Sequence, residues 1–331
     1  ITHGRNMDEF IELPLINIEC LLEDESKEEA SEALDALVRT CEGLGCGQLV
    51  GHGIPVELLA KVREESERFF KSDSGLKMRV KRSKDNARGF MNDELTKNER
   101  DAKEAFDFGK DGAGVDVDGV NRWPEELPEF RKVLEEYFSR VEELCWKLTK
   151  ILTTRALGIW WDSVLSLFER HSSFCRVNYY VEEFLEHETS LGIQRHTDAG
   201  FFTLLATNGV PGLQVYTGDG DGSDREDKAW RTVKPVENAL CFNVADMLQV
   251  LSDNRFRSIL HRVKSVSTDP RLSIAFFWNP SPDIVVQSVA DPVSCSASKY
   301  KALSFGDFRR KRFQGDFTDD GREVQISDYL L

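Results

Sequence analysis

Three residues with metal-binding side chains stand at spacings that suit one shared site. The segment "QRHTD" places His196 and Asp198 two residues apart, and "LHRV" adds His261 after 62 further residues, giving H-x-D-x62-H. Side chains two apart on a strand share a face, so we expect His196 and Asp198 to project together. Two imidazoles and one carboxylate on one side of a metal leave its other positions open, which suits Fe(II) oxygen chemistry. The pattern predicts that these three catalytic residues bind a metal.

A possible anion site follows ten residues after His261. In "RLSIAFFW", Arg271, Ser273 and Phe277 fall on one face of an expected strand. A guanidinium and a hydroxyl aimed into a core are costly unless a partner meets them. A carboxylate taken by the arginine fork, with the serine hydroxyl alongside, would satisfy both. An ion pair with one of the chain's own acids is the alternative.

Further polar groups precede the metal pattern. The strand-like "FCRVNYYV" puts Arg176, Asn178 and Tyr180 on one face. Asn178 and Tyr180 are candidate ligand contacts, although a strand tyrosine is more often packed with its hydroxyl satisfied.

Four residues are candidates for the substrate pocket: Phe277, Gln194, Arg88 and Phe90. Gln194 shares the face of His196 by parity. Arg88 and Phe90 lie in "ARGFMNDE", within a polar, glycine-punctuated stretch that we expect to be mainly loop, and loops often cover substrates. Core packing is the alternative for Phe277, and solvent exposure for Arg88 and Phe90.

The two halves of the chain have different periodicities. Helical spacing of apolar residues predicts helices after residue 24, over 56–71, and from Phe130 to Leu152 with a stop at Gly158. From Phe174 onward the pattern alternates in short runs separated by turns, which predicts a sandwich or barrel. We expect a helical region over 7–165 and a β core over 166–331 in one compact unit.

Composition limits the possible partners. The 331 residues are 40% hydrophobic and 31% charged, as in globular proteins, with a formal net charge of −15. Such a surface repels phosphate backbones, so we expect no nucleic-acid partner. No apolar run reaches the ~18 residues of a membrane span, and we expect no membrane partner. Seven scattered cysteines predict reduced thiols in a cytoplasmic protein, with a monomer as the default.

Taken together, these motifs resemble the plant-type Fe(II)/2-oxoglutarate-dependent dioxygenases, which are relatives of isopenicillin N synthase. The matching blocks, spread over nearly the whole chain, are "LPLINI", "GLGCGQLVGHGIP", "ARGF…DAKEAFDFG", "NYY", "HTD", "LHRV", "RLS" and "FGDFRRKRFQGDF". Val181 follows "NYY" where relatives often carry proline. The resemblance implies an α+β fold with a double-stranded β-helix (jelly-roll) core and a helical N-terminal half around it.

The same resemblance implies the cofactors and the reaction. His196, Asp198 and His261 would bind Fe(II), Arg271 and Ser273 would hold the far carboxylate of 2-oxoglutarate, and Tyr180 and Asn178 would hold its iron-proximal end. O2 would be the oxidant, with ascorbate in support. A C–H bond of a small molecule would be hydroxylated, desaturated or cyclised, with release of succinate and CO2. Arg88, Arg176 and Lys103 suggest a carboxylate or amino-acid-like substrate in specialised metabolism.

Other functions remain open from sequence alone. An iron oxidase of the isopenicillin N synthase or ethylene-forming type would use the same metal ligands without 2-oxoglutarate. Arg271 and Ser273 would then hold a carboxylate of another molecule. A non-catalytic metal-binding barrel and a zinc hydrolase are two further interpretations.

Overall fold

The structure is a computed structural model that describes residues 9–23, 28–96, 99–110, 119–181, 191–218, 229–264, 268–288, 298–315 and 324–331. The α-helices are α1 (Glu19–Glu23), α2 (Glu28–Glu42), α3 (Val56–Phe70), α4 (Ser74–Arg79), α5 (Pro128–Lys150), α6 (Trp161–Phe168), α7 (Asp246–Leu251) and α8 (Phe305–Gly315). A π-helical turn η2 (Ile151–Ala156) and a 3-10 helix η5 (Ile326–Tyr329) complete the helical elements.

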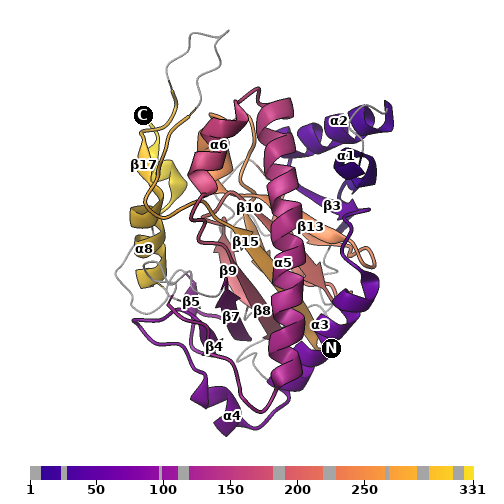
Figure 1. Cartoon of the computed structure of the whole chain (residues 1–331), viewed down its shortest axis with the longest axis vertical. Coiled ribbons are helices and arrows are strands. Elements are labelled where there is room, and N and C mark those ends of the chain that lie inside the picture. Colours follow the sequence, from indigo (N-terminus) through magenta and orange to yellow (C-terminus); the bar gives the residue numbers. More distant parts are fainter. Residues whose placement is uncertain are drawn as a thin grey trace, which may run out of the picture.

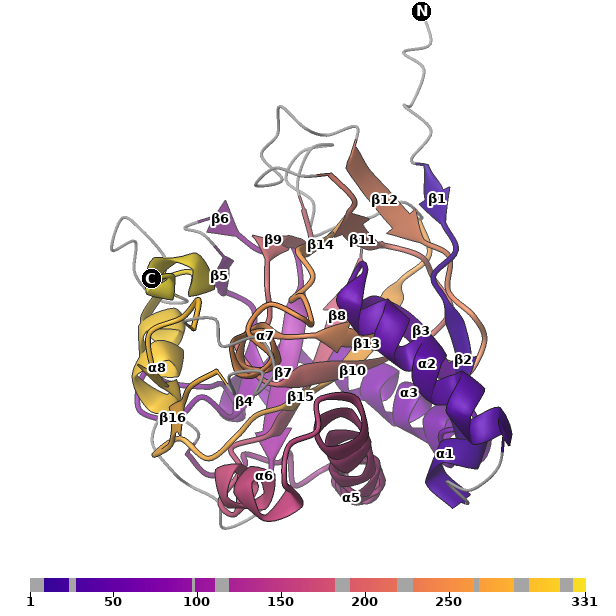
Figure 2. The same cartoon turned by 90° about the horizontal axis from the view of Figure 1, so that it is seen from above.

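Two sheets form the core: most strands of the larger sheet are labelled in Figure 1 and the strands of the smaller sheet in Figure 2. The larger, in spatial order, holds β2 (Leu15–Asn17), β3 (Cys46–Val50), β13 (Leu240–Val244), β10 (Phe202–Thr207), β15 (Arg271–Trp278), β8 (Phe174–Tyr180), β7 (Glu104–Gly109) and β4 (Gly89–Met91). The smaller holds β1 (Phe10–Ile11), β12 (Trp230–Val233), β11 (Leu213–Tyr216), β14 (His261–Val263) and β9 (Ile193–His196). Two short pairs stand apart: β5 (Leu95–Thr96) with β6 (Glu99–Arg100), and β16 (Val285–Val286) with β17 (Leu303–Ser304).

The central strands of the larger sheet are covered on both faces. Every residue of β13 is buried, as are all but one of β10 and of β15, which explains their nearly continuous apolar sequences. One face packs against helices, and the other faces the smaller sheet across a cavity. The predicted α+β fold with a jelly-roll core and helices around it is confirmed.

The long helix α5 covers the larger sheet (Figure 2). Its buried side includes Phe130, Tyr137, Phe138 and Leu148, spaced as the sequence periodicity predicted. The rings of Phe138 and Phe276 of β15 lie 4.9 Å apart, which fixes the helix over the strand. The helix continues as the π-helical turn η2 before the chain turns at Gly158, where φ is +69°.

Strands from the two halves of the sequence share the larger sheet. β3 pairs antiparallel with β13, and β7 pairs antiparallel with β8. The N-terminal strand β1 pairs parallel with β12 of the smaller sheet. The sheets therefore cross the boundary at 165/166 that separates the two sequence patterns.

Some local features were not located from the sequence. The stretch around Arg88, expected to be mainly loop with short structured pieces, contributes β4 and the six-residue β7 to the larger sheet. β7 is held in the sheet by backbone hydrogen bonds to β8, and such tertiary pairing cannot be inferred from a polar local sequence. The short helices α6 and α7 were not predicted.

Two further observations concern the cysteines and the helices that the structure describes. The six cysteines that the structure describes are all free thiols. None of the helices in the described ranges is both long and apolar enough to cross a membrane.

Candidate active site

The three predicted metal ligands converge at the end of the smaller sheet. His196 ends β9 and His261 begins β14, and the two residues face each other in the register of that strand pair. Asp198 lies in the turn that follows β9. The turn therefore brings Asp198 close to His196, whereas the prediction had placed both residues on one face of a strand. The Nε2 atoms of both histidines lie 3.8 Å from Asp198 Oδ1. Two donors that bind one ion at ~2.0–2.2 Å can lie at most about 4.4 Å apart, so both separations allow each histidine to share a cation with Asp198.

Backbone carbonyls orient both imidazoles. His196 Nδ1 lies 2.7 Å from the carbonyl oxygen of Gln194, and His261 Nδ1 lies 3.0 Å from that of Ile259. A carbonyl can only accept, so each Nδ1 carries the proton and each Nε2 presents a lone pair. Burial, with the neighbouring His261 next in importance, holds the pKa of His196 well below its usual range. A neutral imidazole is the form that binds a metal.

The carboxylate of Asp198 is also oriented by a neighbour. The Thr203 hydroxyl on β10 donates to Asp198 Oδ2 at 2.6 Å. The other oxygen, Oδ1, is left facing the two histidines. This arrangement fits a divalent cation bound by one carboxylate oxygen and two imidazole nitrogens, the donor set of non-haem Fe(II) oxygenases.

A cavity of about 240 Å³ lies beside these donors, between the two sheets, and all three ligands line it. Arg271 and Ser273 of β15 line it as well. Arg271 is 4% exposed, its Nε has no hydrogen-bond partner among the described residues, and its Nη1 makes a long 3.4 Å contact with Ser273 Oγ. Burial lowers the pKa of Arg271. A buried guanidinium whose Nε has no partner fits an incoming carboxylate.

Asn178 and Tyr180 on β8 complete this end of the cavity. They pair in register with Ser273 and Arg271, respectively. The guanidinium of Arg271 lies 5.0 Å from the centre of the Tyr180 ring. The side-chain Oδ1 of Asn178 is buried, with no hydrogen-bond partner among the described residues. Both side chains therefore border the space where a carboxylate held by Arg271 would lie.

One wall of the cavity contains buried ion pairs. Arg176 donates two hydrogen bonds of 2.8 Å to Asp107 and lies 2.7 Å from Glu94. Lys103 Nζ lies 2.6 Å from Glu94 and 3.0 Å from Asp101. The basic residues Arg176 and Lys103, which suggested an acidic substrate, are thus already matched by the chain's own acids.

The pKa values of two acids in this wall are shifted in opposite directions, one by neighbouring cations and the other by burial. Burial opposes ionisation of Glu94, but Arg176, Lys103 and Arg82 together hold its pKa well below the usual value. Burial raises the pKa of Asp101 to about 6, because Lys103 and Thr96 offset only part of the desolvation.

The four candidate substrate residues divide evenly. Phe277 and Arg88 line the cavity. Phe90 does not, because its side chain is 1% exposed and packs edge-on against Phe69 in the core. Gln194 is outside the cavity lining too, although its carbonyl orients His196. The substrate predictions for Phe90 and Gln194 are therefore corrected.

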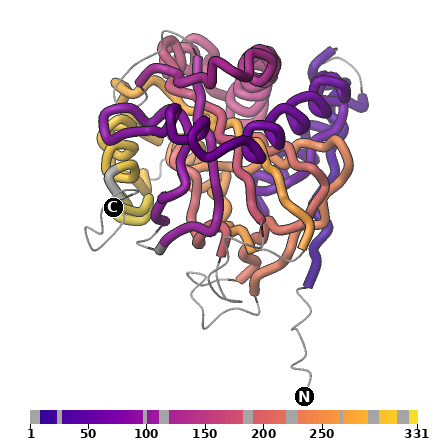
Figure 3. The backbone as a smooth tube through the Cα atoms, turned by 90° about the horizontal axis from the view of Figure 1, so that it is seen from below, coloured from indigo at the N-terminus to yellow at the C-terminus, as the bar shows by residue number. Residues whose placement is uncertain are grey.

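Sequence reasoning missed several residues of the site. Thr203, Glu94, Arg309 and Phe313 line the cavity, but the sequence analysis predicted no role for any of them. Arg309 and Phe313 lie on α8, which closes one side of the cavity, next to the β4–β7 region in Figures 2 and 3. The recognisable block "FGDFRRKRFQGDF" placed this helix in sequence but gave no indication of which side faces the cavity.

Comparison with known proteins gives the same picture. Residues 171–280 match the 2OG-Fe(II) oxygenase superfamily, and residues 13–126 match the family described as non-haem dioxygenase in morphine synthesis N-terminal. Jasmonate-induced oxygenase 4 of Arabidopsis thaliana is 30% identical over 285 residues, covering 84% of this chain and 77% of the relative. Naringenin,2-oxoglutarate 3-dioxygenase of Petunia hybrida is 28% identical over 310 residues, covering 92% and 80%.

Solved structures show the same architecture. A crystal structure of JOX2 in complex with 2OG, Fe and JA superposes with a TM-score of 0.81 at 26% identity, covering 99% of this chain and 92% of that one. The dioxygenase for auxin oxidation in rice gives a TM-score of 0.71 at 23% identity, covering 96% and 100%. At that lower identity, the likeness shows the fold alone.

The chain belongs to the 2OG-Fe(II) oxygenase superfamily. It is an Fe(II)- and 2-oxoglutarate-dependent dioxygenase, an oxidoreductase that uses O2 to oxidise a small molecule.

Proposed function

We propose that His196, Asp198 and His261 hold the Fe(II) and that Arg271 and Ser273 hold the far carboxylate of 2-oxoglutarate. One observation carries the proposal: three metal-binding donors converge in the same cavity as the buried guanidinium of Arg271, whose Nε has no hydrogen-bond partner among the described residues. Bound Fe(II), with 2-oxoglutarate and O2, supplies the oxidising power. For a hydroxylation the balance is 2-oxoglutarate, O2 and R–H giving succinate, CO2 and R–OH.

The chain's own residues bind, orient and exclude water. The carbonyls of Gln194 and Ile259 fix the imidazole tautomers, and Thr203 fixes the carboxylate. Tyr180 and Asn178 border the space between Arg271 and the metal ligands, where they would hold the iron-proximal end of 2-oxoglutarate. Apolar lining residues such as Leu205 and Val263 limit water there.

The substrate is a small carboxylate or amino-acid-like molecule of specialised metabolism whose carboxylate meets Arg88 and Arg309. Arg88, Arg309 and Lys311 line the cavity in addition to Arg176 and Lys103, which the chain's own acids already match. The guanidinium carbons of Arg88 and Arg309 lie 4.9 and 5.4 Å from the centre of the same ring, Phe174. That ring stacks on Phe277, with 4.7 Å between centroids, so an apolar surface adjoins the two cations. Such a wall favours an anion with an apolar body.

The protein is further proposed to act as a monomer in the cytoplasm, where its free cysteines would stay reduced. Its net charge of −15 argues against a nucleic-acid or membrane partner. The regions 7–165 and 166–331 are proposed to fold as one unit, on the basis of the strand pairs β3–β13 and β7–β8. Size-exclusion chromatography with light scattering tests the first point, and a single unfolding transition by circular dichroism and fluorescence tests the second.

Anaerobic mixing tests the cofactor roles. Fe(II) and 2-oxoglutarate added together without O2 are expected to give a visible charge-transfer absorption that neither gives alone. His196→Ala should lose it, and Arg271→Leu should need far more 2-oxoglutarate to reach it. A colourless mixture with retained O2 uptake would favour the iron oxidase that works without 2-oxoglutarate.

A panel of paired compounds tests the substrate class. Small aromatic and aliphatic carboxylic acids are compared with their methyl esters, and succinate release is measured. Acids are expected to stimulate release more than their esters, and Arg88→Gln or Arg309→Gln should raise the apparent KM for the best acid. Equal stimulation by acids and esters would refute the carboxylate assignment without affecting the metal site.

A further inference from the structure

The turn that carries Asp198 is held from two sides. On one side, the start of α7 donates backbone hydrogen bonds to it. Asp246 N lies 2.9 Å from the carbonyl oxygen of Asp198, and Met247 N lies 2.8 Å from that of Gly200. The start of α7 therefore holds the backbone from Asp198 to Gly200 in place.

On the other side, Arg312 of α8 reaches Thr197, the residue between two metal ligands. Arg312 Nη2 lies 3.3 Å from Thr197 Oγ1, and Nη1 lies 3.5 Å from the Thr197 carbonyl oxygen. Arg312 Nη2 also lies 3.0 Å from Asp246 Oδ2, which accepts from the Thr197 hydroxyl at 3.2 Å. The three side chains form a closed set of contacts around the middle of the His196–Asp198 segment.

These contacts are shielded from solvent. The side chain of Asp246 is fully buried and that of Arg312 is 11% exposed. A buried carboxylate needs a charged partner, and Arg312 is the cation that the geometry gives Asp246. The pair is thus fixed in place, and Thr197 is fixed with it.

The same helix lines the cavity where the substrate is proposed to bind. Arg309, Lys311, Arg312 and Phe313 all border it. One helix near the end of the chain therefore touches both the substrate space and the metal-binding turn.

We infer that Arg312 is a positioning residue: through Asp246 and Thr197 it holds the His196–Asp198 turn in its metal-binding geometry, so that α8 completes the iron site. This rests on the proposed assignment of the metal to His196, Asp198 and His261. Arg312 acts by limiting the conformations of the turn before the metal binds. A ligand set ordered in advance loses less entropy on binding.

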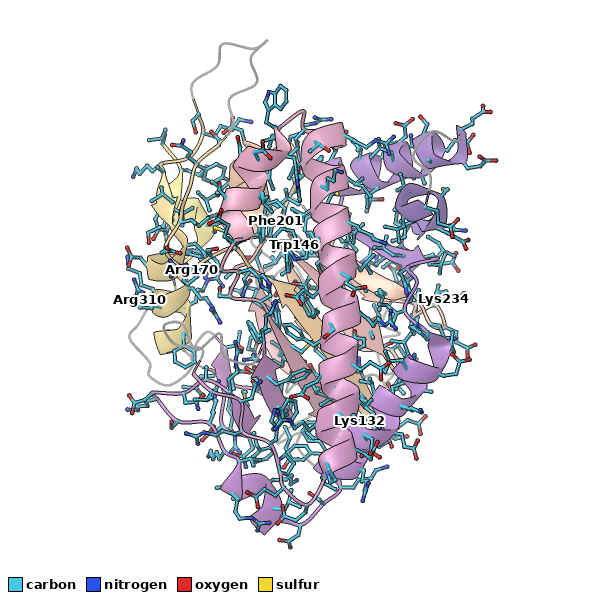
Figure 4. The ribbon with its side chains drawn as sticks, in the orientation of Figure 1. Lys132, Trp146, Arg170, Phe201, Lys234 and Arg310 are labelled. Atoms are coloured by element: carbon cyan, nitrogen blue, oxygen red, sulfur yellow. The ribbon has the colours of Figure 1, made fainter. Side chains whose placement is uncertain are left out.

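The test uses the full chain, free of metal, with Co(II) as an air-stable probe and no 2-oxoglutarate or substrate. Calorimetry measures Co(II) affinity for wild type, Arg312→Lys and Arg312→Gln. Arg310→Gln is the matched control, since Arg310 is the same residue type on the same helix, lies at its outer side in Figure 4 and pairs with Asp307. We expect Arg312→Gln to bind Co(II) roughly 10- to 100-fold more weakly. Arg312→Lys should lie between, and Arg310→Gln should match wild type.

A double variant separates positioning from simple stabilisation. In Arg312→Gln/Asp246→Asn no buried charge is left alone, so the thermal midpoint should recover relative to Arg312→Gln. If Arg312 positions the turn, Co(II) affinity stays low while stability recovers. Recovery of both together, or wild-type affinity in Arg312→Gln, would overturn the inference. Failure of the wild-type protein to bind Co(II) would instead overturn the proposed metal site, and this inference with it.

Discussion

Arg271 and Arg176 lie on neighbouring strands, β15 and β8, and line the same cavity, yet their surroundings differ. Arg271 is buried, its Nε has no hydrogen-bond partner in the described part of the chain, and its Nη1 makes only a long contact with Ser273. Arg176 forms two hydrogen bonds to Asp107 and an ion pair with Glu94. Both side chains are arginines on β-strands, so residue type does not distinguish them.

The difference in hydrogen-bond partners distinguishes a residue that can bind a ligand from a residue that stabilises the fold. Where buried donors are left without partners, a protein retains a desolvation cost that an incoming ligand can relieve. Where they are matched internally, the charges rigidify the wall and have little left for a ligand. The metal end of the cavity, with three convergent donors, belongs to the ligand site together with Arg271, whereas the ion-pair cluster of Arg176, Glu94 and Lys103 belongs to the scaffold.

The largest effect is expected at the metal ligands. His261→Ala should abolish Fe(II) binding and reduce turnover by about 10³-fold or more, because two donors cannot replace three at an otherwise open site. Bound iron is measured after desalting, and turnover by succinate release. His171→Gln is a suitable control, since His171 contacts Glu142 at 2.7 Å and lies outside the cavity lining. Iron bound at wild-type affinity by the His261 variant would contradict the assignment.

Arg271→Leu should weaken 2-oxoglutarate binding by roughly 10²- to 10³-fold, the loss of two charge-assisted hydrogen bonds. Without 2-oxoglutarate, however, its free energy of unfolding should change by less than about 1 kcal/mol, because the substitution leaves no buried acid without its cation. Titration of the anaerobic charge-transfer band gives the first quantity, and urea denaturation the second. A large loss of stability in the free protein would place Arg271 with the scaffold.

The same substitution in the wall should behave in the opposite way. Arg176→Leu is expected to lower the free energy of unfolding by about 3–5 kcal/mol, since Asp107 and Glu94 would be left as buried charges with one cation fewer. Its effect on 2-oxoglutarate affinity should be within about threefold, an effect below 1 kcal/mol. Arg176→Leu/Asp107→Leu should recover part of the stability. A 2-oxoglutarate defect as large as that of Arg271→Leu would remove the distinction between the two regions.

The smallest effect concerns the pH dependence of the wall. The pKa of Asp101 is raised to about 6 in the folded protein, against 3.8 for the unfolded chain. The folded state therefore binds more protons between these values, and this group's contribution to stability falls as pH rises from 3.8 to 6. Asp101→Asn lacks that loss, so its stability relative to wild type should rise by roughly 2–3 kcal/mol between pH 4 and pH 7. Parallel pH profiles for the two proteins in urea denaturation would show that Asp101 ionises normally.

The sequence predicted the strands and the metal ligands because both depend on local signals. Apolar alternation marked β8 to β15, and the H-x-D…H…R-x-S pattern marked the ends of β9, β14 and β15. The helix α5 followed from a single apolar stripe. These features require no knowledge of distant contacts.

The sequence could not reveal which charged side chains form ion pairs with each other. Glu94 lies between β4 and β5 in the sequence. It meets Arg176 of β8 through the tertiary fold, in which β7 pairs with β8. Nothing in the spacing of "MNDE" indicates that partner, so Arg176 and Lys103 were interpreted as signs of an acidic substrate. Likewise β4 could not be located within its mainly loop-like stretch, since edge pairing with β7 is a tertiary contact.

The shared sheet also bears on the order in which the protein can fold. β3 lies between β2 and β13, and β13 is formed by residues about two hundred positions later in the chain. During synthesis, β2 and β3 therefore leave the ribosome long before their partner, with an unpaired sheet edge. Such distant pairing slows folding, and a chain halted before residue 240 would expose that edge to aggregation.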